Sequence, residues 1–367
     1  MNDLLYLIAL TQTENIGPII AKQLIGYCGG AEAVFKEKPS RLLKIPGIGM
    51  QTVSGLKNKD SITKAEKELH FIQKENIKAL VQSDSLYPGR LKHFPDSPLV
   101  LFFKGEADLN TEHVVSIVGT RNISSYGKHL TEQLIQHLAD FEVLVISGLA
   151  YGVDSPAHRV SLLNDIPTVG VLGHGLDRIY PAENKSLAAK MLTKGGLLTE
   201  FCSNTKPDRQ NFPMRNRIVA GMSDAIVVIE TKSGGGSLIT AEFGNEYNKD
   251  VFAFPGKVGD ELSAGCNQLI KNHKAHLIES GEDLTEMLRW EKPGNVRHKQ
   301  VKKELFVNFT EDEDKVVQMI RSKQKVNIDL LSHCLNFTPS QLANILLNLQ
   351  FKGVVQEMPG KTYSICI

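Results

Sequence analysis

Four segments in the middle of the chain carry residue types that bind anions. Three of them, IVGTRNISSYG from Ile117, SGLAYGVDSPAH from Ser147 and TKSGGGSLITAE from Thr231, follow short apolar runs and lead into helical patterns. The fourth, NFPMRNRIVAG from Asn211, opens a helical pattern directly. Because ligands of open α/β sheets bind beyond the carboxyl ends of the strands, we expect the four segments to converge on one site. Glycine lets the backbone approach a ligand, and free N–H groups at helix N-termini suit phosphate, so the predicted ligand is a phosphodiester or a nucleotide.

The first segment offers several donors to one anion. Gly119, Thr120 and Arg121 together supply backbone N–H groups, a hydroxyl and a guanidinium. Ser124 lies near the expected start of a helix and can donate to the same anion, and we place Gly148 of the second segment at the same site. The alternative for the first segment alone is a lone glycine turn with a solvent-facing arginine.

The fourth segment places an aromatic residue beside basic ones. Pro213 suits the first turn of a helix, so we expect Phe212, just before it, to lie at the tip of a loop. Arg209 and Arg215 flank this ring, and such an arrangement stacks a base while holding its phosphates. We also place the guanidinium of Arg217 at the site. The alternative is that Phe212 packs against the following helix as a hydrophobic staple.

The third segment contains a triple glycine between the apolar run DAIVVIE and the helical pattern LITAEFGNEY. Its Gly235, Gly236 and Ser237 are predicted to form a second phosphate cradle by the same physics. The loop lacks the lysine of a Walker loop, and the turn at Gly119 lacks the G-x-G-x-x-G pattern of nicotinamide-binding folds. We therefore expect no cofactor.

Candidates for catalysis are few. Asp154 and His158 are four residues apart near an expected helix start, and we interpret them as structural hydrogen-bonding residues rather than as a general acid and base. His174, Asp177 and Glu200 lie in other candidate loops. The five cysteines form no C-x-x-C pair, which argues against a zinc site and fits a reducing cytoplasm. We predict a cytoplasmic protein with neither catalytic residues nor a metal.

Charge and hydropathy restrict the partners. The 367 residues carry a formal net charge of +1, so nucleic acid must bind through a local basic patch if it binds at all. The N-terminal run LLYLIAL is too short to span a bilayer and is interpreted as part of a core helix. No other segment is long and apolar enough, so we expect no membrane association.

The pattern along the chain predicts three domains and one linker. Residues 1–80 show short helical patterns with two apolar-Gly turns, NIGP and IPGIG, typical of a helix-hairpin-helix (SAM-like) all-α domain. From His113 to about Arg289 strands and helices alternate, which predicts that residues 81–290 form an α/β domain with an extended Rossmann-like, mainly parallel sheet. The polar residues 291–305 are predicted to be a linker. Residues 306–367 show three helical patterns and a hairpin, the order of a winged helix, but the third helix lacks arginine, which favours a structural or partner-docking role.

These segments, in their order along the chain, resemble the bacterial DNA-processing protein A family (DprA, also called Smf). The resemblance spans about residues 83–279 and includes VLGHGLDRIYPAENKSL and VFAFPG besides the four segments. It implies a homodimer, formed through the Rossmann fold and without enzymatic activity, that binds single-stranded DNA, protects incoming DNA and loads the RecA recombinase in natural transformation. The family's DNA pocket corresponds here to Gly119, Thr120, Arg121, Ser124, Phe212, Pro213, Arg215 and Asn216, with Arg209 taking part in some members.

An alternative from another functional class is a LOG-type phosphoribohydrolase, a nucleotide-binding enzyme. Its PGG-x-GT-x-x-E loop resembles TKSGGGSLITAE. Thr240 stands where the spacing from Ser237 would put the glutamate, and Glu242 lies two residues too late. This mismatch favours DNA binding over nucleotide hydrolysis. A purely structural or partner-binding protein would leave the basic segments unexplained.

Overall fold

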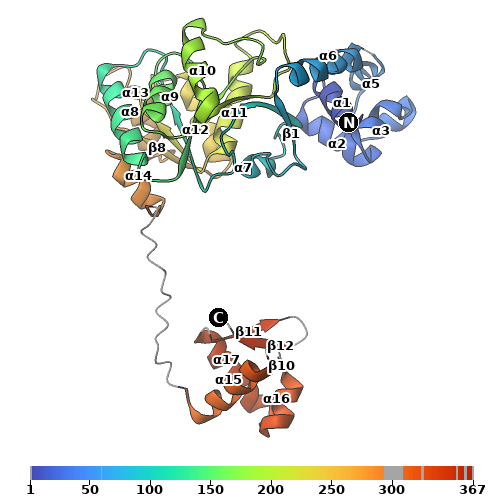
Figure 1. Cartoon of the computed structure of the whole chain (residues 1–367), viewed down its shortest axis with the longest axis vertical. Coiled ribbons are helices and arrows are strands. Elements are labelled where there is room, and N and C mark those ends of the chain that lie inside the picture. Colours follow the sequence, from blue (N-terminus) through green and yellow to red (C-terminus); the bar gives the residue numbers. More distant parts are fainter. Residues whose placement is uncertain are drawn as a thin grey trace. The chain divides into compact units, whose positions relative to one another are not determined.

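The computed structural model describes residues 2–58, 60–292, 309–323, 326–352, 354–358 and 362–365. The chain divides into two compact units, residues 1–295 and 296–367 (Figure 1). Most of the predicted linker lies outside the described residues. No helix in the described part of the chain is long and apolar enough to cross a membrane.

A nine-stranded sheet forms the centre of the first unit, in the order β1-β2-β6-β5-β4-β3-β7-β8-β9. All pairings from β6 to β9 are parallel, whereas β1 and β2 join one edge in antiparallel orientation. The predicted mainly parallel sheet is therefore confirmed. The two edge strands were not predicted, because the alternating pattern begins only at β3. The strands are β1 (Lys78–Val81), β2 (Val100–Gly105), β3 (His113–Val118), β4 (Val143–Ser147), β5 (Thr168–Val171), β6 (Gly196–Thr199), β7 (Ala225–Val228), β8 (Asp250–Ala253) and β9 (His276–Leu277).

Helices cover both faces of this sheet. Every residue of β4 and β7 is buried, which explains their continuous apolar sequences. Alternate residues of these strands enter two separate cores, one under α11 and α12 and the other under α8, α9 and α14. The helices are α7 (Gly89–Lys92), α8 (Ser125–Leu138), α9 (Asp154–Leu163), the 3₁₀ turn η1 (Ala182–Asn184), α10 (Lys185–Lys194), α11 (Asn211–Met222), α12 (Gly236–Glu246), α13 (Ala264–Lys271) and α14 (Gly281–Met287).

Six helices precede the sheet and gather beside β1 at one end of the first unit (Figure 1). They enclose a core of their own around Ile8, Leu24 and Val34, which continues onto Val100 and Phe102 of β2. This shared core joins the helices to the sheet. They are α1 (Asn2–Thr11), α2 (Pro18–Cys28), α3 (Ala31–Lys36), α4 (Pro39–Leu42), α5 (Met50–Lys57) and α6 (Asp60–Lys74).

The described residues of the second unit form three helices and a three-stranded sheet in the order β10-β12-β11. Thr338 and Gln341 form the reciprocal capping box expected at the start of α17. The three helices precede the hairpin strands β11 and β12, and the short strand β10, which was not predicted, lies between the first two helices. The elements are α15 (Glu311–Lys323), β10 (Val326–Asn327), α16 (Ile328–Leu335), α17 (Pro339–Phe351), β11 (Val355–Met358) and β12 (Thr362–Ile365).

Candidate nucleic-acid interface

The four glycine- and arginine-bearing segments meet in one cavity of about 520 Å³. The loops after β3, β4 and β7 and the first turn of α11 form its walls. Nine further residues line it, among them Tyr151, Thr231 and Lys232, which lie in the predicted segments but were not named as site residues. Twelve of the thirteen predicted site residues lie here: Gly119, Thr120, Arg121, Gly148, Arg209, Phe212, Pro213, Arg215, Asn216, Gly235, Gly236 and Ser237.

Ser124 lies outside the cavity. Its hydroxyl accepts from the N–H of Gly127 at 3.0 Å and donates to Glu230 Oε1 at 2.5 Å, while its N–H donates to Glu230 Oε2 at 2.9 Å. Glu230 is buried, and its carboxylate occupies the N-terminus of α8, where negative charge is stabilised. The expectation that Ser124 shares an anion with the Gly119 turn is therefore wrong, because its polar groups already bind a carboxylate of the protein itself.

Arg215 forms part of the floor of the cavity, and its Nη1 bonds the protein backbone. Its side chain is buried, and Nη1 donates to the carbonyl oxygens of Gly148 at 2.6 Å and Val171 at 2.5 Å. Burial lowers the pKa of this guanidinium, while nearby Asp154 acts in the opposite direction. Arg215 thus fastens the β4–α9 loop to the end of β5, and its charge acts on the cavity from below.

Two glycines of the floor are explained by protein packing rather than by ligand access. A Cβ on Gly148 would lie 2.0 Å from Nη1 of Arg215. A Cβ on Gly119 would lie 2.4 Å from the Val153 side chain. Both distances are far below van der Waals contact, so these positions require glycine whether or not a ligand binds.

The rim of the cavity is more exposed. Arg121 and Arg209 face solvent, and the guanidinium carbon of Arg121 lies 5.0 Å from the centroid of the Phe212 ring. Phe212 belongs to the first turn of α11 and is half-buried, so its predicted place at a loop tip is wrong. The ring neighbours Tyr180, with centroids 6.4 Å apart, and Gly173. An exposed guanidinium layered on an aromatic ring is a surface on which an unpaired base can stack.

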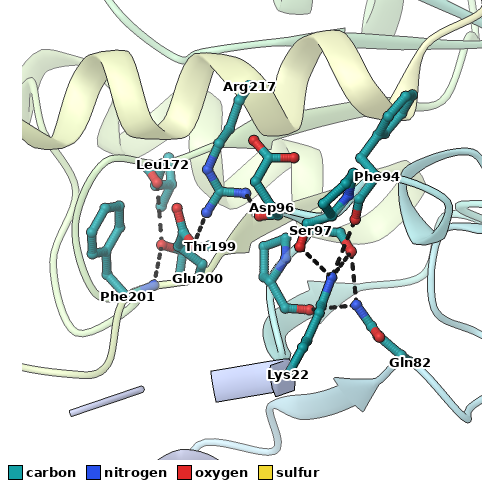
Figure 2. Close-up of polar contacts among 12 residues, drawn as sticks. Lys22, Gln82, Phe94, Asp96, Ser97, Leu172, Thr199, Glu200, Phe201 and Arg217 are labelled. Carbon is teal, nitrogen blue, oxygen red and sulfur yellow. Dashed lines mark hydrogen bonds and ion pairs between the residues drawn. The ribbon is translucent and has the colours of Figure 1, made fainter. Parts of the chain in front are cut away.

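Arg217 does not contribute charge to the cavity. It is buried, donates to the carbonyl oxygen of Asp96 at 2.5 Å and forms an ion pair with Glu200 (Figure 2). Figure 2 shows Lys22 of α2 reaching the same segment, where it bonds the carbonyl oxygen of Phe94. Residues two apart on a helix point about 200° apart, so Arg215 and Arg217 cannot share a face. The expectation for Arg217 was wrong, and helical spacing alone could have corrected it.

The triple-glycine loop opens toward the cavity at the start of α12. Gly235 is the N-cap residue and no side chain caps this helix, so its first N–H groups are available to a ligand. A Cβ on Gly236 would meet nothing within 4 Å. Ser237 is less available, because its buried hydroxyl donates to Thr231 Oγ1 at 2.7 Å. Asn216 donates to the carbonyl oxygen of Gly236 at 3.4 Å and so links α11 to the loop.

Asp154 and His158 are both buried in α9. Asp154 accepts the N–H of Ala150 at 3.1 Å, and burial raises the pKa of its carboxyl. His158 Nδ1 lies 2.6 Å from the hydroxyl of Thr168, and burial lowers the pKa of the imidazole to about 3. The hydroxyl already donates to Val145, so Nδ1 carries the proton and donates to Thr168. In the described part of the chain, no group of three His, Cys, Asp or Glu side chains could hold a metal ion.

Residues 78–289 match the family described as DNA recombination-mediator protein A. The chain belongs to this family. Protein Smf of Synechocystis is 33% identical over 286 residues, which cover 77% of this chain and 72% of the relative. The crystal structure of DprA from Streptococcus pneumoniae matches with a TM-score of 0.64 and 32% identity, over 78% of this chain and 98% of that one. DNA processing protein A of Helicobacter pylori, whose structure describes a single-stranded DNA binding mode, matches with a TM-score of 0.53 and 28% identity, over 58% and 95% of the two chains. The predicted membership of the DprA family is confirmed.

Proposed function

We propose that this family member binds single-stranded DNA in the cavity and acts in DNA processing during transformation. The observation that carries the proposal is the Arg121–Phe212 layer at the rim, which lies beside the uncapped start of α12. An unpaired base stacks on this layer, and the phosphates on either side lie against Arg121, Arg209 and the N–H groups of the triple-glycine loop. The relationship to the Helicobacter pylori protein supports this assignment.

The layer accounts for a preference for single strands. Duplex DNA carries more charge per length than a single strand, so a basic cavity by itself would accept both forms. A base can stack on Arg121 and Phe212 only when it is free of its partner. Arg215 adds charge from below and has no direct contact with DNA in this proposal.

The test compares Phe212→Ala and Arg121→Ala on single-stranded and duplex oligonucleotides. We expect Phe212→Ala to cost about 1–3 kcal/mol on single strands, as for one base-stacking aromatic, and much less on duplex. Arg121→Ala should weaken binding to all sequences alike and reduce the dependence of log affinity on log salt by about 0.7 for one lost phosphate contact. Lys92→Ala is the matched control, because this exposed lysine lies away from the cavity. It belongs to α7, whose Leu91 packs beside Gly221 in the last turn of α11, whereas Phe212 lies in the first turn of that helix. Equal losses on both DNA forms for Phe212→Ala, or unchanged affinity for Arg121→Ala, would refute the proposal.

We also propose that the protein is not an enzyme. Thr240 lines the cavity at the position where a LOG-type phosphoribohydrolase has its glutamate. Glu242 instead lines a separate hollow with Leu238 and Lys274. Incubation with nucleoside monophosphates should release no base, and release that is abolished by Glu242→Gln would favour the hydrolase.

The remaining proposals are less specific to the cavity. We propose a cytoplasmic homodimer that protects incoming DNA and loads RecA, as the family resemblance implies.

We further propose that residues 1–80 form the helix-hairpin-helix (SAM-like) domain, residues 81–290 the DNA-binding domain, residues 291–305 the linker and residues 306–367 the winged helix. Leu347 and Phe351 are exposed on α17, which supports a docking role for the last domain over DNA reading. Size-exclusion chromatography with light scattering tests the dimer.

A further inference from the structure

We propose that a groove between α9 and α10 is a second binding site for single-stranded DNA, which receives the strand as it leaves the cavity. The inference rests on the proposed function of the cavity. The groove encloses about 430 Å³ and is lined by Arg159, Leu163, Lys190 and Lys194, among others. α9 and α10 are neighbours, and each contains ten residues, so the groove is about 15 Å long.

The groove and the cavity share a wall. Tyr151 lines the cavity and donates its hydroxyl proton to Glu183 Oε2 at 2.6 Å, and Glu183 lines the groove. Asn184, also in the groove, donates to the carbonyl oxygen of Leu149 at 2.9 Å and so attaches η1 to the β4–α9 loop. Tyr151 is 45% exposed, which leaves its ring available to a base between the two sites. A strand bound at the rim thus meets an aromatic ring at the entrance to the groove.

The charges of the groove suit a polyanion. Three cations and one carboxylate line it, and Arg159 and Lys190 are exposed. Lys190 and Lys194 are four residues apart on α10, a spacing at which like charges repel each other. Lys194 forms an ion pair with Asp165, whereas Arg159 and Lys190 have no carboxylate within salt-bridge distance among the described residues. Phosphates along the groove would supply partners for Arg159 and Lys190.

Apolar surface in the groove suits the rest of a nucleotide. Leu163 is 77% exposed, and Leu162 and Leu187 lie beside it in the lining. Bases and sugars pack on such surface without sequence preference, while cations hold the backbone. The combination of exposed leucine and free cations favours a single strand over a duplex, whose bases are paired.

The hollow beside α8 is a less suitable path for the strand. It is lined by Ser124, Tyr126 and the 255–263 loop, and its charged residues are Lys257, Asp260 and the buried Glu230. Two carboxylates against one cation repel phosphate. Electrostatics therefore directs the strand toward α9 and α10.

The test measures binding of oligo(dT) of about 6 and about 20 nucleotides, lengths that fill one site or both. The variants are Arg159→Ala, Lys190→Ala and the double variant, with Lys92→Ala as the control. We expect the double variant to bind the longer oligonucleotide severalfold more weakly and to lower its salt slope by about 1.4, at about 0.7 for each phosphate contact. Affinity for the shorter one should be unchanged, and so should the urea midpoint.

Three outcomes would overturn the inference. The double variant could bind the longer oligonucleotide like wild type, which would leave the groove to another partner such as an acidic peptide. It could weaken both lengths equally, or the Lys92→Ala control could lose as much affinity as Lys190→Ala, and either result would indicate a general loss of positive charge. Failure of the cavity proposal is distinguishable, because wild-type protein would then not bind the shorter oligonucleotide.

Discussion

The floor and the rim of the cavity use the same residue types for different purposes. The floor consists of Gly119, Gly148, Asp154 and Arg215, and the rim of Arg121, Arg209, Phe212 and Gly236. In the floor, Arg215 bonds backbone carbonyl oxygens, and Gly148 makes room for its guanidinium. In the rim, Arg121 is exposed over a ring, and Gly236 borders open space.

The same glycine- and arginine-bearing segments therefore stabilise the loops of the site and also form its binding surface. Adjacent glycines and arginines in the sequence divide between packing and binding according to the direction in which each one points. Substitutions in the floor should therefore change stability first, and substitutions in the rim should change binding alone.

The largest effect is expected for Arg215→Leu. The change removes the donor from the carbonyl oxygens of Gly148 and Val171, at a cost of about 1–3 kcal/mol for each buried group left unpaired. Urea unfolding measures the loss. Arg121→Leu is the matched rim control and should change stability by less than about 0.5 kcal/mol. Similar losses for the two variants would erase the distinction between floor and rim.

The next effect is expected for Gly148→Ala. The added methyl group would lie 2.0 Å from Arg215 Nη1, so the side chain must move, and such overpacking costs about 1–3 kcal/mol. Thermal and urea unfolding would report the loss, and DNA affinity would fall along with it. A variant as stable as wild type would show that the floor can accommodate the methyl group, and would contradict the expectation that substitutions in the floor reduce stability.

The buried imidazole of His158 should make the free energy of unfolding depend on pH. The pKa of His158 is about 3 in the folded protein, below the value of about 6.5 expected when unfolded. Between these values only the unfolded state binds the proton, so the free energy of unfolding should fall by about 1.4 kcal/mol per pH unit as the pH drops below 6.5. The difference between wild type and His158→Leu isolates this slope from other titrating groups. Parallel pH profiles for the two proteins would contradict a neutral, buried imidazole.

The smallest change in stability is expected for Gly236→Ala. The new methyl group meets no protein atom and stands in the first turn of α12, so stability should stay the same or rise by up to about 1 kcal/mol. Single-stranded DNA should nevertheless bind severalfold more weakly, because the methyl group occupies space that a phosphate needs. Filter binding or fluorescence anisotropy measures this. Unchanged affinity would remove the triple-glycine loop from the DNA site.

The sequence does not predict which residues of the four segments belong to the floor of the cavity and which to its rim. The sequence predicts one anion site at the Gly119 turn and Ser124. In the structure, however, the N–H and the hydroxyl of Ser124 both donate to the carboxylate of Glu230, 106 residues away in the sequence. Tyr151 and Lys232 belong to the predicted segments, but the sequence did not show that their side chains line the cavity, because only the fold determines which residues of a loop face it. The antiparallel strands β1 and β2 were missed for a similar reason, since their place in the sheet depends on pairing with β6.

The convergence of the four segments at one site of a mainly parallel sheet follows from the amino-acid order alone. Apolar runs fixed the strands, and parallel strands place the loops at their carboxyl ends on the same edge. The role of each side chain at this site depends instead on the folded structure. Arg215 and Arg217 are both arginines of one helix, yet one fastens the floor of the cavity and the other is neutralised by Glu200 on the opposite side. Their roles depend on which distant backbone or carboxylate each one meets, and such contacts arise only when the chain has folded.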